Sequence, residues 1–378
     1  MATITVQAGE HARRHCPVWL PVDVSALPGG DVGLRGQAGE VLPAQVLAGE
    51  SPALCFVIPS LARGQSAAYE VIPHSADTGG VGLADVPGDR VEVTLNDSPF
   101  TSYHYADTWA RPFLLPIIGP FGDPITRHFP VEDVDGEAQD HPHHKSCWVA
   151  WGEVNGSDHW SEAENRFARQ VHQRFDTIES GPVFGRIVAT NHWLDLQGEV
   201  VLEEQRTLTF YNVPAAERLM DLKVVFTATC GPVEFGDTKE GGICSIRVAT
   251  TMDAKKDGTI VNSYGGTNEA ETWGKRASWC DYYGPVNDKT VGISIFDTPG
   301  NFRYPTYWHV RNYGLMTANP FGLSYFLNDK ETSGTHTIAA GEVFPFAYRL
   351  YFHAGTTEDA GVAGKYLDYV AQPSVALA

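Results

Sequence analysis

Histidines and tryptophans are concentrated between residues 140 and 160, where the sequence reads DHPHHKSCWVAWGEVNGSDHW. The histidines of this segment are His141, His143, His144 and His159, and its tryptophans are Trp148, Trp151 and Trp160. Imidazole is a common metal ligand, and it also transfers protons near neutral pH. Indole rings stack on the apolar faces of sugar rings, whose hydroxyl edges bind polar side chains. The segment therefore predicts a site that binds a metal ion, transfers protons or contacts a sugar.

Metal ligation is one interpretation of the histidines. In an extended segment, His141 and His143 would share a face and His144 would take the other. Pro142 excludes the helical His-x-x-x-His zinc motif. If a divalent metal is bound, we expect its ligands among His141, His143, His144 and His159. Two other interpretations of these histidines stay open. They could be structural residues that form hydrogen bonds, or residues that transfer protons or contact a substrate, and the neighbouring tryptophans favour the second.

A charged pair falls within an apolar pattern at residues 199–211. Alternate residues of an extended strand share a face, and here that face carries apolar side chains together with Glu204 and Arg206. Buried charges are costly unless they are paired. Two interpretations stay open: a structural ion pair in the core, or a sheet face that lines a substrate pocket.

A second polar cluster precedes a glycine pair in FGDTKEGGICSIRVA at 235–249. Glycine permits a tight turn or a close approach of the backbone, and charged loops at the mouth of a β-sandwich often bind ligands. A charged hairpin tip is the structural alternative. The order of the residues favours a ligand site and excludes a phosphate-binding loop, whose glycine spacing is absent.

The candidate residues form two sets. The expected catalytic residues are His143, His144, His159, Glu204 and Glu240. The expected substrate-binding residues are Arg127, Trp148, Trp160, His192, Arg206, Asp237, Lys239 and His309. His192 and His309 are included because each lies next to a tryptophan in the sequence.

Composition excludes several classes of partner. The formal net charge of −19 argues against nucleic acid and against an anionic membrane surface. No window approaches the roughly 18 consecutive apolar residues of a membrane span, and the N-terminal segment lacks an apolar signal-peptide core.

The six cysteines form no Cys-x-x-Cys pair, so we expect reduced thiols and a cytoplasmic protein. No dinucleotide fingerprint or nucleophile elbow is present, so no organic cofactor is expected.

The pattern of elements predicts an all-β protein. Residues 1–88 read as short strands separated by turn residues, which indicates a small β-sandwich, with a linker at 75–89. Four long runs between 170 and 230 follow one another without a helical period, which favours antiparallel hairpins. We therefore expect a large antiparallel β-sandwich over 89–378. One surface helix of about 10 residues is expected within 355–372.

Four segments of this sequence resemble the bacterial PmoA-like family: RPFLLPIIGPFGDPITR, DHPHHKSCWVAWGEVNGSDHW, EEQRTLTF and GDTKEGG. The resemblance covers about residues 90–355, with Glu153 where the family usually has Asp and Lys145 where it usually has Arg. It implies a galactose-mutarotase-like β-sandwich (a supersandwich). The methane-oxygenase label of that family does not fit a chain without transmembrane segments. Relatives that occur beside sugar dehydrogenases of the Gfo/Idh/MocA type imply work on sugars or oxidised sugars.

The sequence thus predicts a carbohydrate-active enzyme. Acid–base chemistry on a sugar or a 3-keto-glycoside, by elimination, hydration or hydrolysis, is the leading expectation, because a ketone acidifies the neighbouring C–H bond. A sugar mutarotase or epimerase, a metal-dependent oxygenase and a non-catalytic sugar-binding module are the alternatives. The partner expected is a small sugar, and homo-oligomerisation is left open.

Overall fold

The computed structural model describes residues 2–74, 79–163 and 167–378. It is nearly all β, with 49% of residues in strands and 6% in helices, as the sequence predicts. Neighbouring strands in each sheet are antiparallel. Among the described residues, no helix has both the length and the apolar character needed to cross a membrane.

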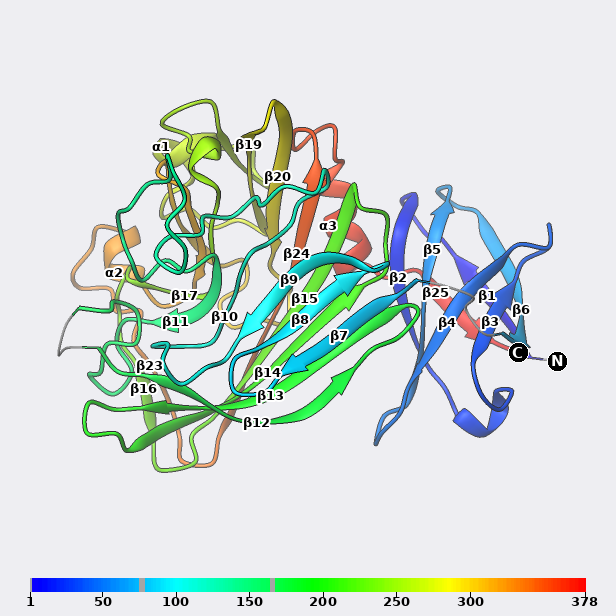
Figure 1. The fold of residues 1–378 in the computed structure, drawn as a ribbon, viewed down its shortest axis with the longest axis horizontal. Coiled ribbons are helices and arrows are strands. Elements are labelled where there is room, and N and C mark those ends of the chain that lie inside the picture. The colour runs from blue at the N-terminus through cyan, green and yellow to red at the C-terminus, as the bar shows by residue number, and fades with distance from the viewer. Residues whose placement is uncertain (1, 75–78, 164–166) are drawn as a thin grey trace.

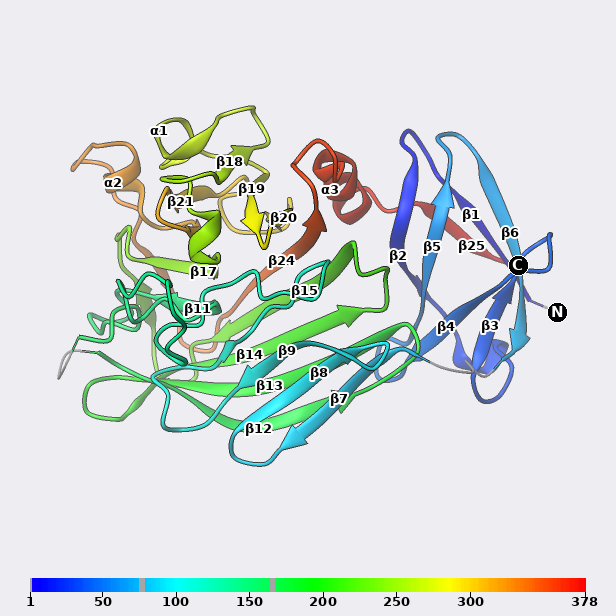
Figure 2. The same ribbon diagram turned by 45° about the horizontal axis from the view of Figure 1, so that its top comes forward.

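A seven-stranded sheet forms the smaller part of the molecule and encloses its own apolar core. Figures 1 and 2 show it at one end of the chain's long axis, with the N- and C-termini side by side. Its strands, in spatial order, are β2 (Arg13–Pro21), β5 (Ala53–Leu61), β4 (Val41–Leu47), β3 (Val32–Arg35), β6 (Ser66–Pro73), β1 (Thr3–Gln7) and β25 (Ser374–Leu377). A short 3-10 turn, η1 (Val24–Ala26), connects β2 and β3.

The sheets do not divide at residue 88, where the sequence places the boundary. Strand β7 (Val81–Val86) lies within the expected linker, yet it pairs with β8 (Arg90–Leu95) in the larger part. Strand β25, at the opposite end of the chain, pairs with β1 through Ile4 and Leu377. Residues 75–78 of the expected linker lie outside the described residues. The first sheet is therefore assembled from both ends of the chain.

Two eight-stranded sheets face each other in the larger part. The first runs β21 (Tyr307–Arg311), β22 (Leu315–Asn319), β17 (Gly241–Arg247), β11 (Cys147–Trp151), β10 (Phe113–Leu114), β9 (Ser98–His104), β8 and β7. The second runs β12 (Gln170–Glu179), β13 (Phe184–Leu194), β14 (Val200–Tyr211), β15 (Glu217–Thr227), β24 (Val343–Ala354), β20 (Lys289–Phe296), β19 (Trp279–Val286) and β18 (Thr259–Asn262). The smaller elements are β16 (Val233–Phe235), β23 (His336–Ile338), η2 (Thr250–Met252), α1 (Asn268–Thr272) and α2 (Leu323–Phe326). The four successive hairpin strands expected from the sequence are β12 to β15.

Side-chain alternation separates the core of the sandwich from its outer surface. Cys147, Val149 and Trp151 of β11 point between the two sheets and belong to the main core. Trp148 and Ala150 point the other way and join a second, smaller apolar cluster on the outer face of the first sheet. Because successive side chains of a strand point to opposite faces, one strand supplies both clusters. That outer face is where the candidate site lies.

The predicted C-terminal helix is α3 (Val362–Val370), which packs against β2. Its Lys365 ammonium lies 2.6 Å from the Glu217 carboxylate at the start of β15. Its Asp368 carboxylate lies 3.4 Å from the Arg13 guanidinium of β2. These buried ion pairs connect the helix to both parts of the molecule.

Candidate functional site

A row of polar and aromatic side chains crosses four neighbouring strands on the outer face. In the strand register, His309 is opposite Thr317, Thr317 is opposite Ser245, and Ser245 is opposite Trp148. The hydroxyls of Ser245 and Thr317 are hydrogen-bonded to each other at 2.7 Å. Three strand spacings place the ends of the row about 14 Å apart. We call this row, together with the 140–144 segment beside it, the imidazole face.

The three neighbouring histidines lie on a turn and not on an extended segment. The His144 amide donates to the His141 carbonyl at 3.0 Å, and His141 has a left-handed φ of 45°. The expectation that His144 faces away from the other two is therefore wrong. The His141 and His144 rings are stacked at 4.8 Å, and the His143 ring packs edge-on against that of His144 at 4.4 Å. The turn thus gathers all three imidazoles.

Aromatic rings surround the turn. Tyr313 stacks on His141 with ring centroids 4.8 Å apart, and Trp148 stacks on His144 at 5.3 Å. Trp160 packs against Trp148 at 5.4 Å. The indole nitrogens of both tryptophans are buried and have no acceptor among the described residues. Two strong donors are therefore left for a ligand or for water.

Arg127 holds the histidine turn in place. One terminal nitrogen donates to the carbonyls of Ala138 and Asp140, at 3.0 and 2.6 Å. The other donates to the carbonyls of His141 and His144, at 2.9 and 3.3 Å. The guanidinium is fully buried, so the structure gives Arg127 a scaffolding position in place of the direct substrate contact expected from the sequence.

Fixed donors set the tautomers of two imidazoles. The Arg247 guanidinium donates to Nδ1 of His144 at 3.2 Å, and the Trp273 indole donates to Nδ1 of His309 at 3.2 Å. Neither donor can accept a hydrogen bond, so in each ring Nε2 carries the proton. Burial lowers the pKa of His144 and lowers the pKa of His309 to about 3. Both rings are therefore neutral N–H donors near pH 7.

His143 differs from these two imidazoles because its ring has no hydrogen bond to any described residue. Its backbone carbonyl is held by Arg111, which also donates to the Trp160 carbonyl at 2.7 Å. Burial, followed by the charge of Arg111, lowers the pKa of His143 to about 3. Lys145, two residues further on, forms an ion pair with Glu162. His143 is thus a neutral imidazole with an unused lone pair.

The 236–242 segment borders the other end of the row. Asn319 donates to the carbonyls of Thr238 and Lys239 at 3.1 and 3.2 Å, which fixes the segment beside β22. Lys239 and Glu240 form an ion pair, and their side chains are 34% and 47% exposed. The charge of Lys239 helps to lower the pKa of His309, after burial. The sequence-predicted pair therefore lies at the rim of the imidazole face.

The glycine pair has a steric explanation. A Cβ on Gly242 would lie 1.3 Å from the Thr317 hydroxyl, and one on Gly241 would lie 2.5 Å from the Trp151 ring. The segment also contains Asp237, whose carboxylate accepts from the amides of residues 324 and 334 at 3.0 and 2.8 Å. Asp237 therefore ties loops together, whereas the sequence predicts a substrate contact.

Glu204 and Arg206 lie on the far side of the first sheet from the imidazole face. Their side chains are enclosed between the two sheets, with Arg206 Nε 2.5 Å from the Glu204 carboxylate. Trp193 donates to the same carboxylate at 2.7 Å. Of the two interpretations left open by the sequence, the structure supports the core ion pair.

His159 and His192 are also separated from the other histidines. His159 is fully buried, donates from Nε2 to the Leu194 carbonyl at 2.8 Å, and lies against Trp193. Burial lowers its pKa to about 4. His192 lies opposite Glu203 on the second sheet, with a ring-to-carboxylate distance of 3.6 Å. Neither ring joins the imidazole face.

Metal ligation of His141, His143, His144 and His159 stays a prediction. Over residues 2–74, 79–163 and 167–378, no three His, Cys, Asp or Glu side chains are grouped in a way that could hold a metal ion. The contacts of His159 are with Ser157, Leu194 and Trp193, and none of them is with the other three histidines.

Several residues of the imidazole face, or in contact with it, were not in the sequence-predicted sets. They are Arg111, Asp140, Ser245, Arg247, Trp273, Tyr313 and Thr317. The alternation of side chains along β17 could have been used to predict that Ser245 and Arg247 lie on the same face of the sheet. Tyr313 and Trp273 lie in turns, where no periodic pattern indicates which way a side chain points.

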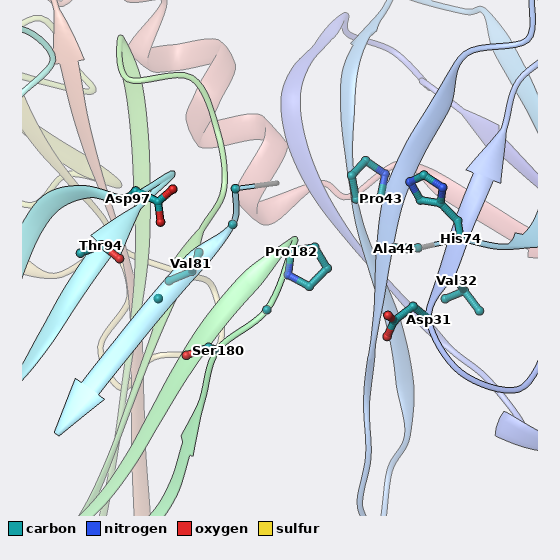
Figure 3. Close-up of a pocket in the computed structure, with 14 residues that line it drawn as sticks. Asp31, Val32, Pro43, Ala44, His74, Val81, Thr94, Asp97, Ser180 and Pro182 are labelled. Carbon is teal, nitrogen blue, oxygen red and sulfur yellow. The ribbon is translucent and has the colours of Figure 1, made fainter. Parts of the chain in front are cut away.

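A separate cavity of about 350 Å³ lies where the two parts of the molecule meet. Figure 3 shows Asp31 and His74 on the side of the small sheet, and Asp97 and Ser180 on the opposite side. No residue of the imidazole face lines it.

The chain belongs to a family of unknown function (DUF6807), whose model matches residues 90–367. This range contains every residue of the imidazole face. The family description states no activity, and the PmoA-like label stays an expectation from the sequence. No curated protein matches the chain.

Solved structures of three proteins are similar to this chain at low identity. A protein in glycosyl hydrolase family 38 from Enterococcus faecalis has a TM-score of 0.49 and 11% identity, over 100% of this chain and 47% of that one. A galactose mutarotase related enzyme from Lactobacillus acidophilus has a TM-score of 0.30 and 8% identity, over 73% and 98%. An aldose epimerase homologue from C. elegans has a TM-score of 0.31 and 7% identity, over 74% and 100%. This chain spans about half the length of the family 38 protein.

Proposed function

We propose that the imidazole face is the active site of an enzyme that moves protons on a sugar or an oxidised sugar. The proposal rests on the observation that His144 and His309 are both fixed as neutral Nε2–H donors on one face. Aromatic rings next to them supply apolar surface, and unpaired indole N–H groups supply further donors. A ligand with apolar faces and oxygen-rich edges suits this combination.

The geometry supports one distribution of roles. When a proton leaves the carbon beside a ketone, negative charge develops on the carbonyl oxygen, and preorganised donors stabilise it. His144, whose ring packs against that of His143, is such a donor, and His309 further along the row donates to another oxygen of the sugar. His143 has an unused lone pair and accepts the proton, and Glu240 at the rim is the partner carboxylate. Loss of a leaving group from the neighbouring carbon would then complete an elimination. A 3-keto-glycoside is the substrate that fits these roles.

The partners follow from this chemistry. A ketone on the sugar ring has to be made by an oxidation, so a sugar dehydrogenase of the Gfo/Idh/MocA type would supply the substrate.

Turnover of 3-keto-glycosides by variants of the face tests the proposal. We expect His144→Ala to lower kcat/KM by about 100-fold or more, because it removes the donor to the developing charge, and His309→Ala to lower it by about tenfold, because it removes a hydrogen bond to the sugar. His192→Ala is the matched control, since His192 lies on the other sheet. Melting temperatures of all three variants show whether the fold is kept. Full turnover in folded His144→Ala protein contradicts the assigned role.

Product analysis by NMR separates the competing functions. Elimination gives an unsaturated ketone, whereas a mutarotase or epimerase changes configuration at one carbon and keeps the glycosidic bond. Sugar binding without turnover, unchanged in the histidine variants, would identify a binding module. Elemental analysis of protein purified without chelator tests the metal-dependent oxygenase.

A further inference from the structure

We propose that the ligand of the imidazole face carries an acidic group, so that the substrate is a sugar acid or a sugar phosphate. This inference rests on the proposed function and names the substrate class for the same site. Donors without acceptors and an excess of cations over carboxylates carry it.

Hydrogen-bond donors without acceptors collect on this face. The indole nitrogens of Trp148 and Trp160 are buried without an acceptor among the described residues. His144 and His309 each present Nε2–H, because their Nδ1 atoms already accept from protein donors. The only hydroxyls of the row, on Ser245 and Thr317, are hydrogen-bonded to each other. A sugar hydroxyl donates as well as accepts, whereas a carboxylate or phosphate oxygen only accepts. The donor set therefore matches an acidic group better than a further hydroxyl.

Cations surround the aromatic side of the face. The Tyr313 ring lies 5.0 Å from the Arg247 guanidinium, 5.5 Å from that of Arg311 and 5.5 Å from the Lys255 ammonium. Arg311 is paired with Glu269 at 2.9 Å. Lys255 is exposed and has no ion pair within the described part of the chain.

One carboxylate has to serve two of the guanidinium groups. The Asp140 Oδ1 atom accepts from Arg127 and from Arg247, each at 2.7 Å. Asp253 and Glu269 supply two further carboxylates, so three carboxylates face the four cations Arg127, Arg247, Arg311 and Lys255. This local surplus of positive charge contrasts with the net charge of −19 on the whole chain. A bound anion would balance it.

The histidine pKa values are consistent with this surplus. Burial lowers the pKa of each imidazole first, and neighbouring cations lower it further. The cations are Arg111 at His143, Arg247 at His144 and Lys239 at His309.

Calorimetric titration with matched sugars tests the inference. Methyl glycosides of gluco, galacto and manno configuration are each compared with the corresponding uronate and 6-phosphate. We expect an acidic member to bind about tenfold more tightly than its neutral partner in at least one series, with a preference that falls as salt is added. The uronate and phosphate arms show which acidic group is preferred.

Two neighbouring lysines provide the variant and its control. Lys255→Ala removes the unpaired cation beside Tyr313, and we expect it to reduce the preference for the acid severalfold. Lys256→Ala removes an equal, exposed charge one residue further on and is expected to leave the preference intact. Equal affinity for acid and neutral sugars in every series overturns the inference while the proposed function stands. If no sugar binds and none is turned over, the proposed function fails as well.

Discussion

Replacing Arg206 by methionine should destabilise the protein strongly. The Glu204 carboxylate is completely buried and accepts from Arg206 at 2.5 and 3.0 Å and from Trp193 at 2.7 Å. Without the guanidinium, only the indole donor is left for a buried carboxylate. Removing one partner of a buried ion pair costs about 3–5 kcal/mol, because the other charge stays uncompensated in the core.

The complementary variant should behave in the same way, and the double variant should not. Glu204→Gln keeps an oxygen for Trp193 but leaves the Arg206 guanidinium without its counter-charge, so a loss of similar size is expected. In Glu204→Gln combined with Arg206→Met, no charge is left unpaired. We therefore expect the double variant to lose clearly less than the sum of the two single losses, by about 2 kcal/mol or more.

Urea unfolding followed by tryptophan fluorescence measures these losses. With a slope of about 3 kcal/mol/M, the single variants should unfold at a midpoint about 1–1.7 M below that of the wild type. Turnover per folded molecule should be retained, since the pair lies between the sheets. A loss below about 1 kcal/mol would refute the structural interpretation. A loss of turnover at unchanged stability would support the catalytic role of Glu204 that the sequence predicts.

Two further predictions concern glycines and one concerns pH. Gly242→Ala should lower both stability and turnover, because the new Cβ would overlap the Thr317 hydroxyl. In Gly364→Ala the new Cβ in α3 meets open space, so this variant should be more stable than the wild type by about 0.5–1 kcal/mol. Thermal unfolding of both variants checks these two outcomes. The Glu137 carboxylate, 2.9 Å from the ring, raises the pKa of His128, so the folded state holds this proton to higher pH than the unfolded state. The stability from this pair is present below about pH 6.5 and is lost as pH rises through the folded pKa, so the wild type should lose more stability than His128→Gln between pH 6 and pH 8.

Local patterns were sufficient to predict the long strands and the C-terminal helix, but they missed the short helices α1 and α2 and could not predict the pairing. Strands β12 to β15 and the helix α3 follow from the period of apolar residues, which is set by neighbouring residues. The pairing of Ile4 with Leu377 depends on two segments that are almost the whole chain apart. Nothing in either short segment indicates its partner, so the boundary at residue 88 could not be placed correctly.

The histidine turn shows a similar limit. A proline after His141 indicates that a helix is absent, but an extended segment and a turn are both compatible with it. The turn conformation is stabilised by the four hydrogen bonds from Arg127 to backbone carbonyls, and it requires the left-handed φ of His141. Arg127 precedes the turn by 14 residues, and the sequence does not reveal that it folds back beneath it.

The number of hydrogen-bond acceptors that the protein supplies to a cationic side chain distinguishes structural cations from those that are available to a ligand. Arg127 has carbonyl acceptors on both terminal nitrogens and a carboxylate acceptor on one of them, and Arg206 is paired with Glu204 and the Pro112 carbonyl. A guanidinium in such surroundings organises the chain and has little capacity left for substrate, although its residue type alone suggests anion binding. Lys255 is exposed, lies beside Tyr313, and lacks an ion pair among the described residues. Positive charge available to a ligand is therefore found at Lys255, a position that no motif in the sequence marks.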